Sequence, residues 1–278
     1  TFSEFIKNID IILLAYAFVT GYYPRDSRYV FSADDASFEH IYGTWYETLP
    51  HSLKSGYSVF PSSRLRIYFS LPHKIEFPQQ FFNSLCNKLK QQEELSRVLF
   101  LIVEGHTLST EMQATVYTVA LEAMTGIISK ENETKYVPIT SKTLSKKFIG
   151  ELLDILNKYS ADIPQQAMDT LKRKISVINT PTNKDKLLKP FELLGIKLVQ
   201  KEIDCINKRN DFLHGRLPLV SGDSDQKYQL QQIATTLLYC VSTLVLKYVG
   251  YTGYVMYYPT LNEYNQKKRF TDYLIKSI

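Results

Sequence analysis

The stretch that decides the predicted fold is FELLGIKLVQKEIDCINKRNDFLHG, residues 191–215. Its apolar side chains recur at intervals of three and four residues, which is typical of a helix with a wide apolar face. One stripe contains Phe191, Leu194, Leu198, Cys205 and Phe212, and a second contains Val199, Ile203, Ile206 and Leu213. The pattern predicts one helix from about Pro190 to Leu213, which Gly215 and Pro218 then end.

Three polar side chains interrupt the apolar face near the end of this predicted helix. Arg209 lies on the first stripe, and Asn210 and His214 extend the second. Unpaired polar groups are costly to bury, so they need partners: each other, another helix, a second subunit or a ligand. Asn210 and His214, four residues apart, can touch. Arg209 and His214 lie about 140° apart on a helix, so they share a face only if the helix ends between them.

The pattern Arg-Asn-x-x-x-His at 209–214 resembles the signature of the HEPN superfamily, small helical domains of which many are metal-independent ribonucleases. Two further stretches resemble the Apea-like HEPN branch. YTVALEAMTG (117–126) is similar to its Glu-bearing helix, and LVLKYVGYTGY (244–254) to its closing helix and Gly-Tyr-x-Gly-Tyr tail. The resemblance covers about residues 80–258. It implies that two subunits face each other so that both motifs line one cleft, and several proteins of this branch act in antiviral defence.

The residue types of the motif suit RNA cleavage without a metal. Histidine titrates near neutral pH, so we assign His214 the proton transfers. Arginine stays charged and binds phosphate bidentately, so Arg209 takes the phosphate, and Asn210 orients the imidazole or a phosphate oxygen. Lys208 and Arg216 are expected to bind substrate. The alternative is that Arg209 and His214 form a satisfied ion-pair and hydrogen-bond network at a dimer interface.

Glu122 is the fourth candidate catalytic residue. It is the only charged residue within 112–129, in a helix that is otherwise apolar nearly all round. Its polar stripe also contains Thr115, Thr118 and Thr125. Charges in such settings are usually paired, and we expect Glu122 to hold Arg209 in place. The alternative is a short stripe that faces solvent.

Composition indicates a soluble globular protein of one or two domains. The chain has 278 residues, of which 44% are hydrophobic and 22% charged, as is ordinary for such proteins. The net charge of +5 is uneven, because residues 140–220 hold 15 Lys and Arg against 9 Asp and Glu. A basic surface around the motif suits a polyanion such as RNA. A solvated helical surface is the alternative explanation.

The cysteines and apolar runs predict a cytoplasmic protein. Cys86, Cys205 and Cys240 are too few and too scattered for a disulfide framework or a zinc site, and Cys205 and Cys240 are expected in the core. We expect neither a metal nor a cofactor. The apolar run Ile11–Val19 is too short to span a bilayer, and no secretory signal is visible. The sequence starts at Thr1, from which we expect upstream sequence to be missing or removed.

The predicted fold is mainly α: a HEPN-like helical bundle with an irregular, partly extended N-terminal region. We expect an N-terminal helix and irregular extension at 1–77, a HEPN-like helical domain at 78–258 and a C-terminal tail at 259–278. Further helices are predicted at 2–20, 36–49, 78–104 (one helix or a broken pair), 109–129, 143–158, 164–178 and 226–249. Extended segments are predicted at 64–71 and 250–258.

These features together predict a metal-independent endoribonuclease of the HEPN type, which cleaves RNA by attack of the 2′-hydroxyl. Its expected partners are RNA, with tRNA as one candidate substrate, and a second copy of the chain, bound through the motif face. Its expected role is phage defence by abortive infection. The alternative is an inactive HEPN module used for dimerisation or as a sensor. The joint presence of Glu122, Arg209, Asn210 and His214 favours the enzyme.

Overall fold

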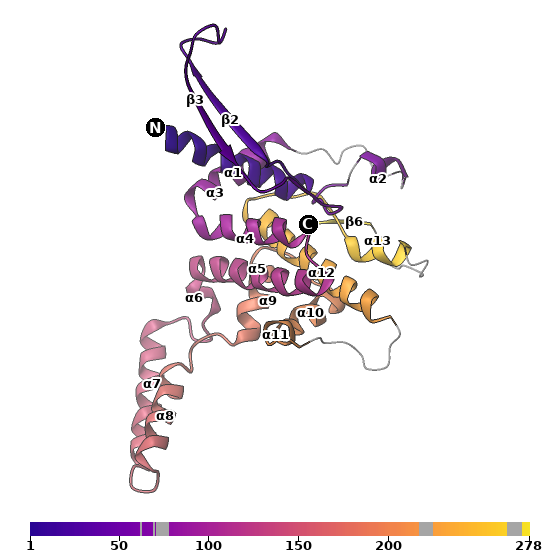
Figure 1. The fold of residues 1–278 in the computed structure, drawn as a ribbon. Coiled ribbons are helices and arrows are strands. Elements are labelled where there is room, and N and C mark those ends of the chain that lie inside the picture. Colours follow the sequence, from indigo (N-terminus) through magenta and orange to yellow (C-terminus); the bar gives the residue numbers. More distant parts are fainter. Residues whose placement is uncertain (62, 69, 71–77, 217–224, 266–273) are drawn as a thin grey trace. The chain divides into compact units, whose positions relative to one another are not determined.

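The computed structural model describes residues 1–61, 63–68, 70, 78–216, 225–265 and 274–278, and it confirms a mainly helical fold (Figure 1). By their internal contacts the residues form two compact units. Unit 1 consists of Thr1–Met124 and Leu198–Ile278, and unit 2 consists of Thr125–Lys197. Helix α5 (Thr110–Glu131) runs from unit 1 into unit 2. The domain boundaries expected near residues 77 and 258 stay predictions.

Unit 1 begins with helix α1 (Phe2–Thr20), as predicted. The hydroxyl of Thr1 caps its start by accepting a hydrogen bond from the Glu4 amide. Gly21 ends the helix with φ 72°, a left-handed conformation that favours glycine. A Cβ at this position would lie 1.9 Å from the Tyr57 carbonyl oxygen. Helix α1 packs on α3 (Gln79–Gln91) and α4 (Glu93–Gly105), the expected broken pair.

The predictions for residues 36–49 and 64–71 are wrong. Strands β2 (Ser27–Ala33) and β3 (Ile41–Thr48) form an antiparallel hairpin, in which Val30 lies opposite Trp45. The β-branched and aromatic residues of β3 favour a strand, and this preference outweighs the helical spacing of its flanks. The described part of 64–71 lies mostly in a short helix, α2 (Ser63–Tyr68). The alternation that predicted an extended segment is too short to distinguish a strand from a helix. Strands β1 (Tyr22–Tyr23) and β4 (Leu53–Lys54) form a second small pair.

The core of unit 1 lies around helix α12 (Gln226–Tyr248), which starts and ends within a residue of its predicted bounds. Most of its side chains are buried, and the helix packs on α10 (Gln200–Asn207) and α13 (Tyr258–Asn265). Because such a helix has almost no solvent-facing side, its polar residues need internal partners. The hydroxyls of Thr235 and Thr236 donate to the carbonyl oxygens of Gln231 and Gln232 in the preceding turn.

The predicted extended segment after α12 contains one short strand. Strand β5 (Tyr254–Met256) pairs with β6 (Ile275–Ser277), so the end of the chain returns to unit 1. The prediction placed residues 257 and 258 in the same extended segment, but Tyr258 already begins helix α13. Val255 and Met256 are buried, whereas Tyr254 is half exposed.

The single helix predicted from Pro190 to Leu213 is wrong. Pro190 lies inside helix α9 (Asn183–Leu193), and Gly195, with φ 70°, ends that helix. The chain then runs without helical structure to Val199, and helices α10 and α11 (Arg209–Leu213) follow, with Lys208 between them. The apolar spacing continued across these breaks, so periodicity alone did not reveal them. Gly215 does end α11; Pro218 lies outside the described residues.

Unit 2 contains a helical hairpin made of α7 (Lys142–Asn157) and α8 (Gln165–Ser176), close to the predicted bounds (Figure 1). Asn179, which follows α8, links this segment to the start of the hairpin. Its side-chain amide donates to Ile139 O at 3.0 Å and to Ser145 Oγ at 2.9 Å. The same side chain accepts from the Ile139 amide at 2.7 Å. A short helix, α6 (Glu133–Tyr136), packs on α9 in the same unit.

Candidate functional site

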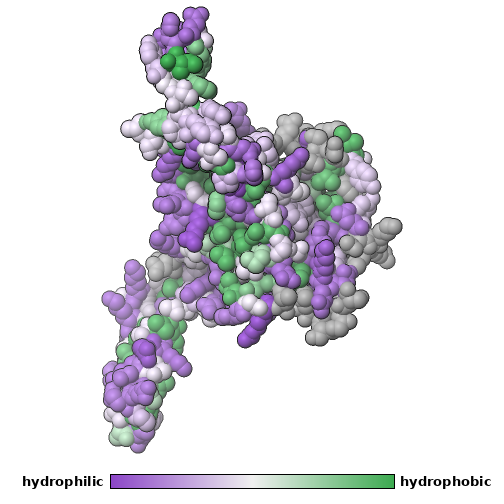
Figure 2. Space-filling view, in the orientation of Figure 1, coloured by the Kyte–Doolittle hydropathy of each residue, from purple (hydrophilic) through white to green (hydrophobic). Residues whose placement is uncertain are grey.

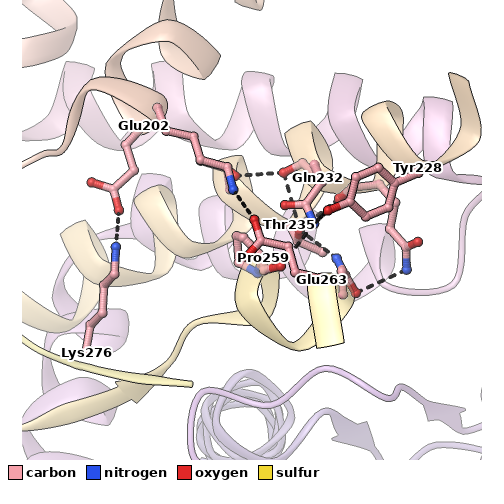
Figure 3. Close-up of polar contacts among 11 residues, drawn as sticks. Glu202, Tyr228, Gln232, Thr235, Pro259, Glu263 and Lys276 are labelled. Atoms are coloured by element: carbon pink, nitrogen blue, oxygen red, sulfur yellow. Dashed lines mark hydrogen bonds and ion pairs between the residues drawn. The ribbon is translucent and has the colours of Figure 1, made fainter. Parts of the chain in front are cut away.

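A buried ion pair fixes the start of helix α10, which leads to the motif. Glu202 is 2% exposed at its side chain, and its Oε1 lies 2.9 Å from Nζ of Lys276 in strand β6 (Figure 3). Its Oε2 accepts a hydrogen bond from the Val199 amide at the N-terminus of α10. The Lys276 ammonium also lies 3.4 Å from the centroid of the Tyr257 ring. Strand β6 therefore anchors the helix that precedes Arg209.

Arg209 is the first residue of α11 and is buried, with 9% of its side chain exposed. Its Nε donates to Glu122 Oε1 of helix α5 at 3.1 Å, so the ion pair predicted between these two residues is present. The Glu122 side chain is 40% exposed, which means that solvent reaches this pair from the α5 side. Among the described residues nothing accepts a hydrogen bond from the terminal Nη groups of Arg209, so Glu122 orients the guanidinium without occupying these donors.

Asn210 and His214 lie on the surface, unlike Arg209. Helix α11 ends in a Schellman motif, in which the Arg216 amide donates to Asp211 O at 2.7 Å and the Gly215 amide to Phe212 O at 3.1 Å. His214 is the last residue before the left-handed Gly215. Within the described part of the chain, the His214 imidazole makes no hydrogen bond or ion pair. The imidazole is therefore open to solvent in a single chain.

The motif residues do not all share one face. Helix α11 does end between Arg209 and His214, at Leu213, but this ending does not bring the two side chains to one surface. Arg209 points into unit 1, and His214 is exposed. No hydrogen bond joins the Asn210 and His214 side chains in the described part of the chain, although the His214 amide donates to Asn210 O at 3.1 Å. One chain thus brings together Arg209 and Glu122 only.

A groove of about 440 Å³ lies beside the motif, between α10 and the first turns of α12. This volume is within the range of small-molecule sites. Its lining residues on the α10 side are Lys201, Asp204, Cys205 and Lys208, and those on α12 are Tyr228, Gln229, Gln232 and Ile233. The lining combines cations, amides, an aromatic ring and apolar side chains. Such a lining can hold a base and an adjacent phosphate of a nucleotide.

Hydrogen bonds order the floor of this groove (Figure 3). Gln232 is buried, and its Nε2 donates to the Tyr228 hydroxyl at 2.9 Å and to Pro259 O at 3.0 Å. At the other side of the groove, Lys201 Nζ lies 2.7 Å from Glu263 Oε1 of α13. Helix α13 therefore holds groove residues on both walls, and the groove has a defined shape.

The two expected substrate-binding residues lie in different settings. Lys208 is half-buried and lines the groove, directly before Arg209 in the chain. Arg216 is exposed beyond the end of α11, and its backbone completes the Schellman motif. Sequence reasoning missed the groove residues of α12, such as Tyr228 and Gln232, because the signal would have had to come from contact between two distant helices.

A second cavity, lined in part by His106, is too small for a ligand larger than water, at about 20 Å³. His106 Nδ1 lies 2.8 Å from the Tyr117 hydroxyl. Burial disfavours the charged imidazole and lowers the pKa of His106 to about 3. Burial also raises the pKa of Tyr117 well above its usual value. These two groups stay neutral near pH 7, and we assign them a structural role.

Comparisons with known proteins gave no match for this chain. No family model, no curated protein and no solved structure matches it. Within the described ranges, no cluster of three or more His, Cys, Asp or Glu side chains is arranged to hold a metal ion. No helix of those ranges has the length and apolar character that a bilayer crossing requires.

Proposed function

We propose that this protein is an endoribonuclease of the HEPN type, with a helical bundle of that superfamily, that cleaves RNA by attack of the 2′-hydroxyl without a metal. The observation that carries the proposal is the ion pair between Arg209 and Glu122, which joins two of the four candidate catalytic residues across 87 positions of sequence. An arginine held by its Nε keeps two terminal nitrogens for a phosphate. The basic stretch 140–220 and the groove beside Lys208 also support a polyanionic substrate.

In the proposed reaction, His214 acts as base and then as acid. The imidazole removes the proton of the 2′-hydroxyl, whose oxygen then forms a bond to phosphorus. Arg209 stabilises the charge that develops on the phosphoryl oxygens. The bond from phosphorus to the 5′-oxygen breaks, and the imidazolium returns a proton to that oxygen. The products are a 2′,3′-cyclic phosphate and a free 5′-hydroxyl.

We further propose that two copies of the chain assemble each site from both motifs. Arg209 and His214 of one chain lie in different settings, because Arg209 is buried whereas His214, just past the end of helix α11, is exposed. If two chains meet through their motif faces, Arg209 of one copy and His214 of the other can line one cleft. Such an arrangement also explains why Asn210 and His214 lie exposed beside apolar side chains such as Leu213.

In this proposal the groove binds the nucleotide next to the scissile phosphate. Lys208 supplies positive charge at the groove, and the Tyr228 ring offers a surface on which a base can stack. The proposed substrate class is cellular RNA, with tRNA as one candidate, and the proposed role is phage defence in the cytoplasm.

The test is incubation of the pure protein with tRNA, with a structured RNA and with DNA of the same sequence, all in EDTA. We expect RNA products that end in a cyclic or opened 2′,3′-phosphate, and uncut DNA, which lacks the attacking hydroxyl. His214→Ala should abolish cleavage while the fold is kept, because the side chain is exposed. Arg209→Lys should cut far more slowly, since a point charge does not replace a planar fork. Cleavage that needs magnesium, or that survives His214→Ala, would overturn this mechanism.

The variant Glu122→Gln tests whether the Glu122 carboxylate orients the Arg209 guanidinium for catalysis. It keeps a hydrogen-bond acceptor near Arg209 Nε but removes the charge, and the partly exposed pair is worth only about 1 kcal/mol in stability. We expect a clear loss of cleavage with little loss of stability. A variant with unchanged cleavage would refute an orienting role for the carboxylate.

The second candidate function is an inactive HEPN module used for dimerisation or sensing. It is favoured by the burial of Arg209 and its separation from His214 within one chain. A pure protein that dimerises through the motif face but cuts no RNA would support it.

A further inference from the structure

The helical hairpin of unit 2 has an apolar surface that its own packing does not use. Helix α7 packs on α8, and its Leu152, Leu153 and Leu156 are half-buried or buried. Another set of apolar side chains remains exposed: Leu144 (56%), Phe148 (39%), Ile155 (50%) and Tyr159 (55%), which we call the outer stripe. Figure 2 shows apolar residues at the surface of this hairpin among hydrophilic ones. An isolated exposed apolar residue is ordinary, but a row at helical spacing asks for a partner.

The spacing of the residues in the outer stripe is symmetric about its centre. Its members are separated by four, seven and four residues, so its centre falls between Glu151 and Leu152. When two such helices lie antiparallel about that centre, Leu144 meets Tyr159 of the other copy, and Phe148 meets Ile155. Tyr159 lies just past the end of α7, in a turn where its amide donates to Leu156 O at 3.1 Å. This symmetry is what a two-fold contact between identical chains requires.

The charges of α7 have the same self-complementary arrangement. Its first half carries Lys142, Lys146 and Lys147 and no acidic residue, and its second half carries Glu151 and Asp154, with Lys158 directly after the helix. An antiparallel pair places the basic half of each helix beside the acidic half of the other. A parallel pair would place like charges together, which is unfavourable.

We propose that α7 pairs antiparallel with α7 of a second copy, so that the two hairpins form a four-helix bundle with the outer stripes at its centre. Packing of four helices around apolar stripes is a common arrangement for hairpins. A helix of this length is about 24 Å long, so the contact is small and its pairing reversible. The inference goes beyond the proposed function and does not depend on it.

Glu151 is the one charged residue close to the axis of this pairing. The two copies of Glu151 would approach each other across it, and Lys147, 3.9 Å from Glu151 in the same helix, compensates only in part. Repulsion there weakens the contact. Glu151→Leu should therefore strengthen it, because the variant removes the repulsion and fills the gap in the outer stripe.

The test is sedimentation velocity of the full chain over a dilution series. We expect the assembly of the wild type to have twice the mass of the double variant Phe148→Glu, Ile155→Glu at the same concentration. Glu151→Leu should shift association to concentrations about tenfold lower. Val177→Glu is the matched control, because Val177 is 54% exposed on the same hairpin but lies outside the outer stripe, and it should change nothing. Circular dichroism checks that each variant keeps its helices.

A charge exchange tests the orientation. Lys147→Glu alone should weaken the pairing, since it places two acidic side chains near each other across the contact. Adding Asp154→Lys in the same chain restores opposite charges and should restore the pairing. If the double variant Phe148→Glu, Ile155→Glu sediments with the same mass as the wild type, the proposal is overturned. The proposal is also overturned if the outer stripe binds another protein but not a second copy of the chain. It is overturned as well if the Glu151→Leu variant associates no more strongly than the wild type.

Discussion

Lys276→Met should destabilise the protein strongly, although it changes one side chain only two positions before Ile278, the last described residue. The Glu202 carboxylate, 2% exposed, would lose the ammonium 2.9 Å away and stay charged in a buried place. Removing one partner of a buried ion pair costs about 3–5 kcal/mol. The Val199 amide still donates to Glu202, and the N-terminus of α10 favours a carboxylate, so we expect the lower end, about 3 kcal/mol. Unfolding by urea, followed by circular dichroism, measures the change.

The matched control is Lys201→Met in the same region. Lys201 lies 2.7 Å from Glu263, but its side chain is 40% exposed, so its loss should cost less than about 1 kcal/mol. Combining Lys276→Met with Glu202→Gln should recover part of the stability, because no charge is then left buried without a partner. If Lys276→Met destabilises no more than Lys201→Met does, the reasoning about the anchor between strand β6 and helix α10 is refuted.

Three further outcomes follow from the structure. Gly21→Ala should cost more than about 2 kcal/mol in thermal unfolding, because φ is 72° and a Cβ would meet Tyr57 O at 1.9 Å; a smaller cost would refute the clash. The folded-state pKa of His106, about 3, lies below its unfolded value of 6.5, so the contribution of the neutral imidazole to stability is full above pH 6.5 and falls towards pH 3. In urea unfolding, His106→Asn should therefore lose less stability than the wild type between pH 6 and pH 4. An equal loss of stability in the two proteins would contradict this. A thiol reagent should label half-buried Cys86 before buried Cys240, since burial raises the pKa of the Cys240 thiol further; the reverse order would refute this.

Local sequence patterns were enough to predict the helices whose ends are marked by a capping residue or a terminating glycine. Helix α1 begins after Thr1 and ends at Gly21, and α7 begins after Ser141, so capping chemistry and spacing agree there. The motif region was mispredicted because Gly195 ended a helix inside an unbroken apolar period. The N-terminal hairpin was mispredicted because the pairing of β2 with β3 is decided between strands and not within one of them.

The candidate site was predictable only in part. The isolation of Glu122 in an apolar helix pointed to Arg209, since a charge there needs a partner, and the ion pair is present. The position of His214 depended on where α11 ends, which angular spacing alone does not decide. The anchor from Lys276 to Glu202 and the groove residue Tyr228 come from segments far apart in the chain. No local pattern could join them.

The most direct test of the central claim is a complementation experiment with two inactive variants. Arg209→Gln and His214→Ala are made with different tags, co-expressed in equal amounts and purified through both tags in parallel with the wild type. If each site combines Arg209 of one chain with His214 of the other, every mixed dimer contains one intact site. The mixed dimers purified through both tags should then cut RNA in EDTA at about half of the wild-type rate, because each has one of two sites intact. A mixture as inactive as each variant alone, beside an active wild type, would contradict a site shared between two chains.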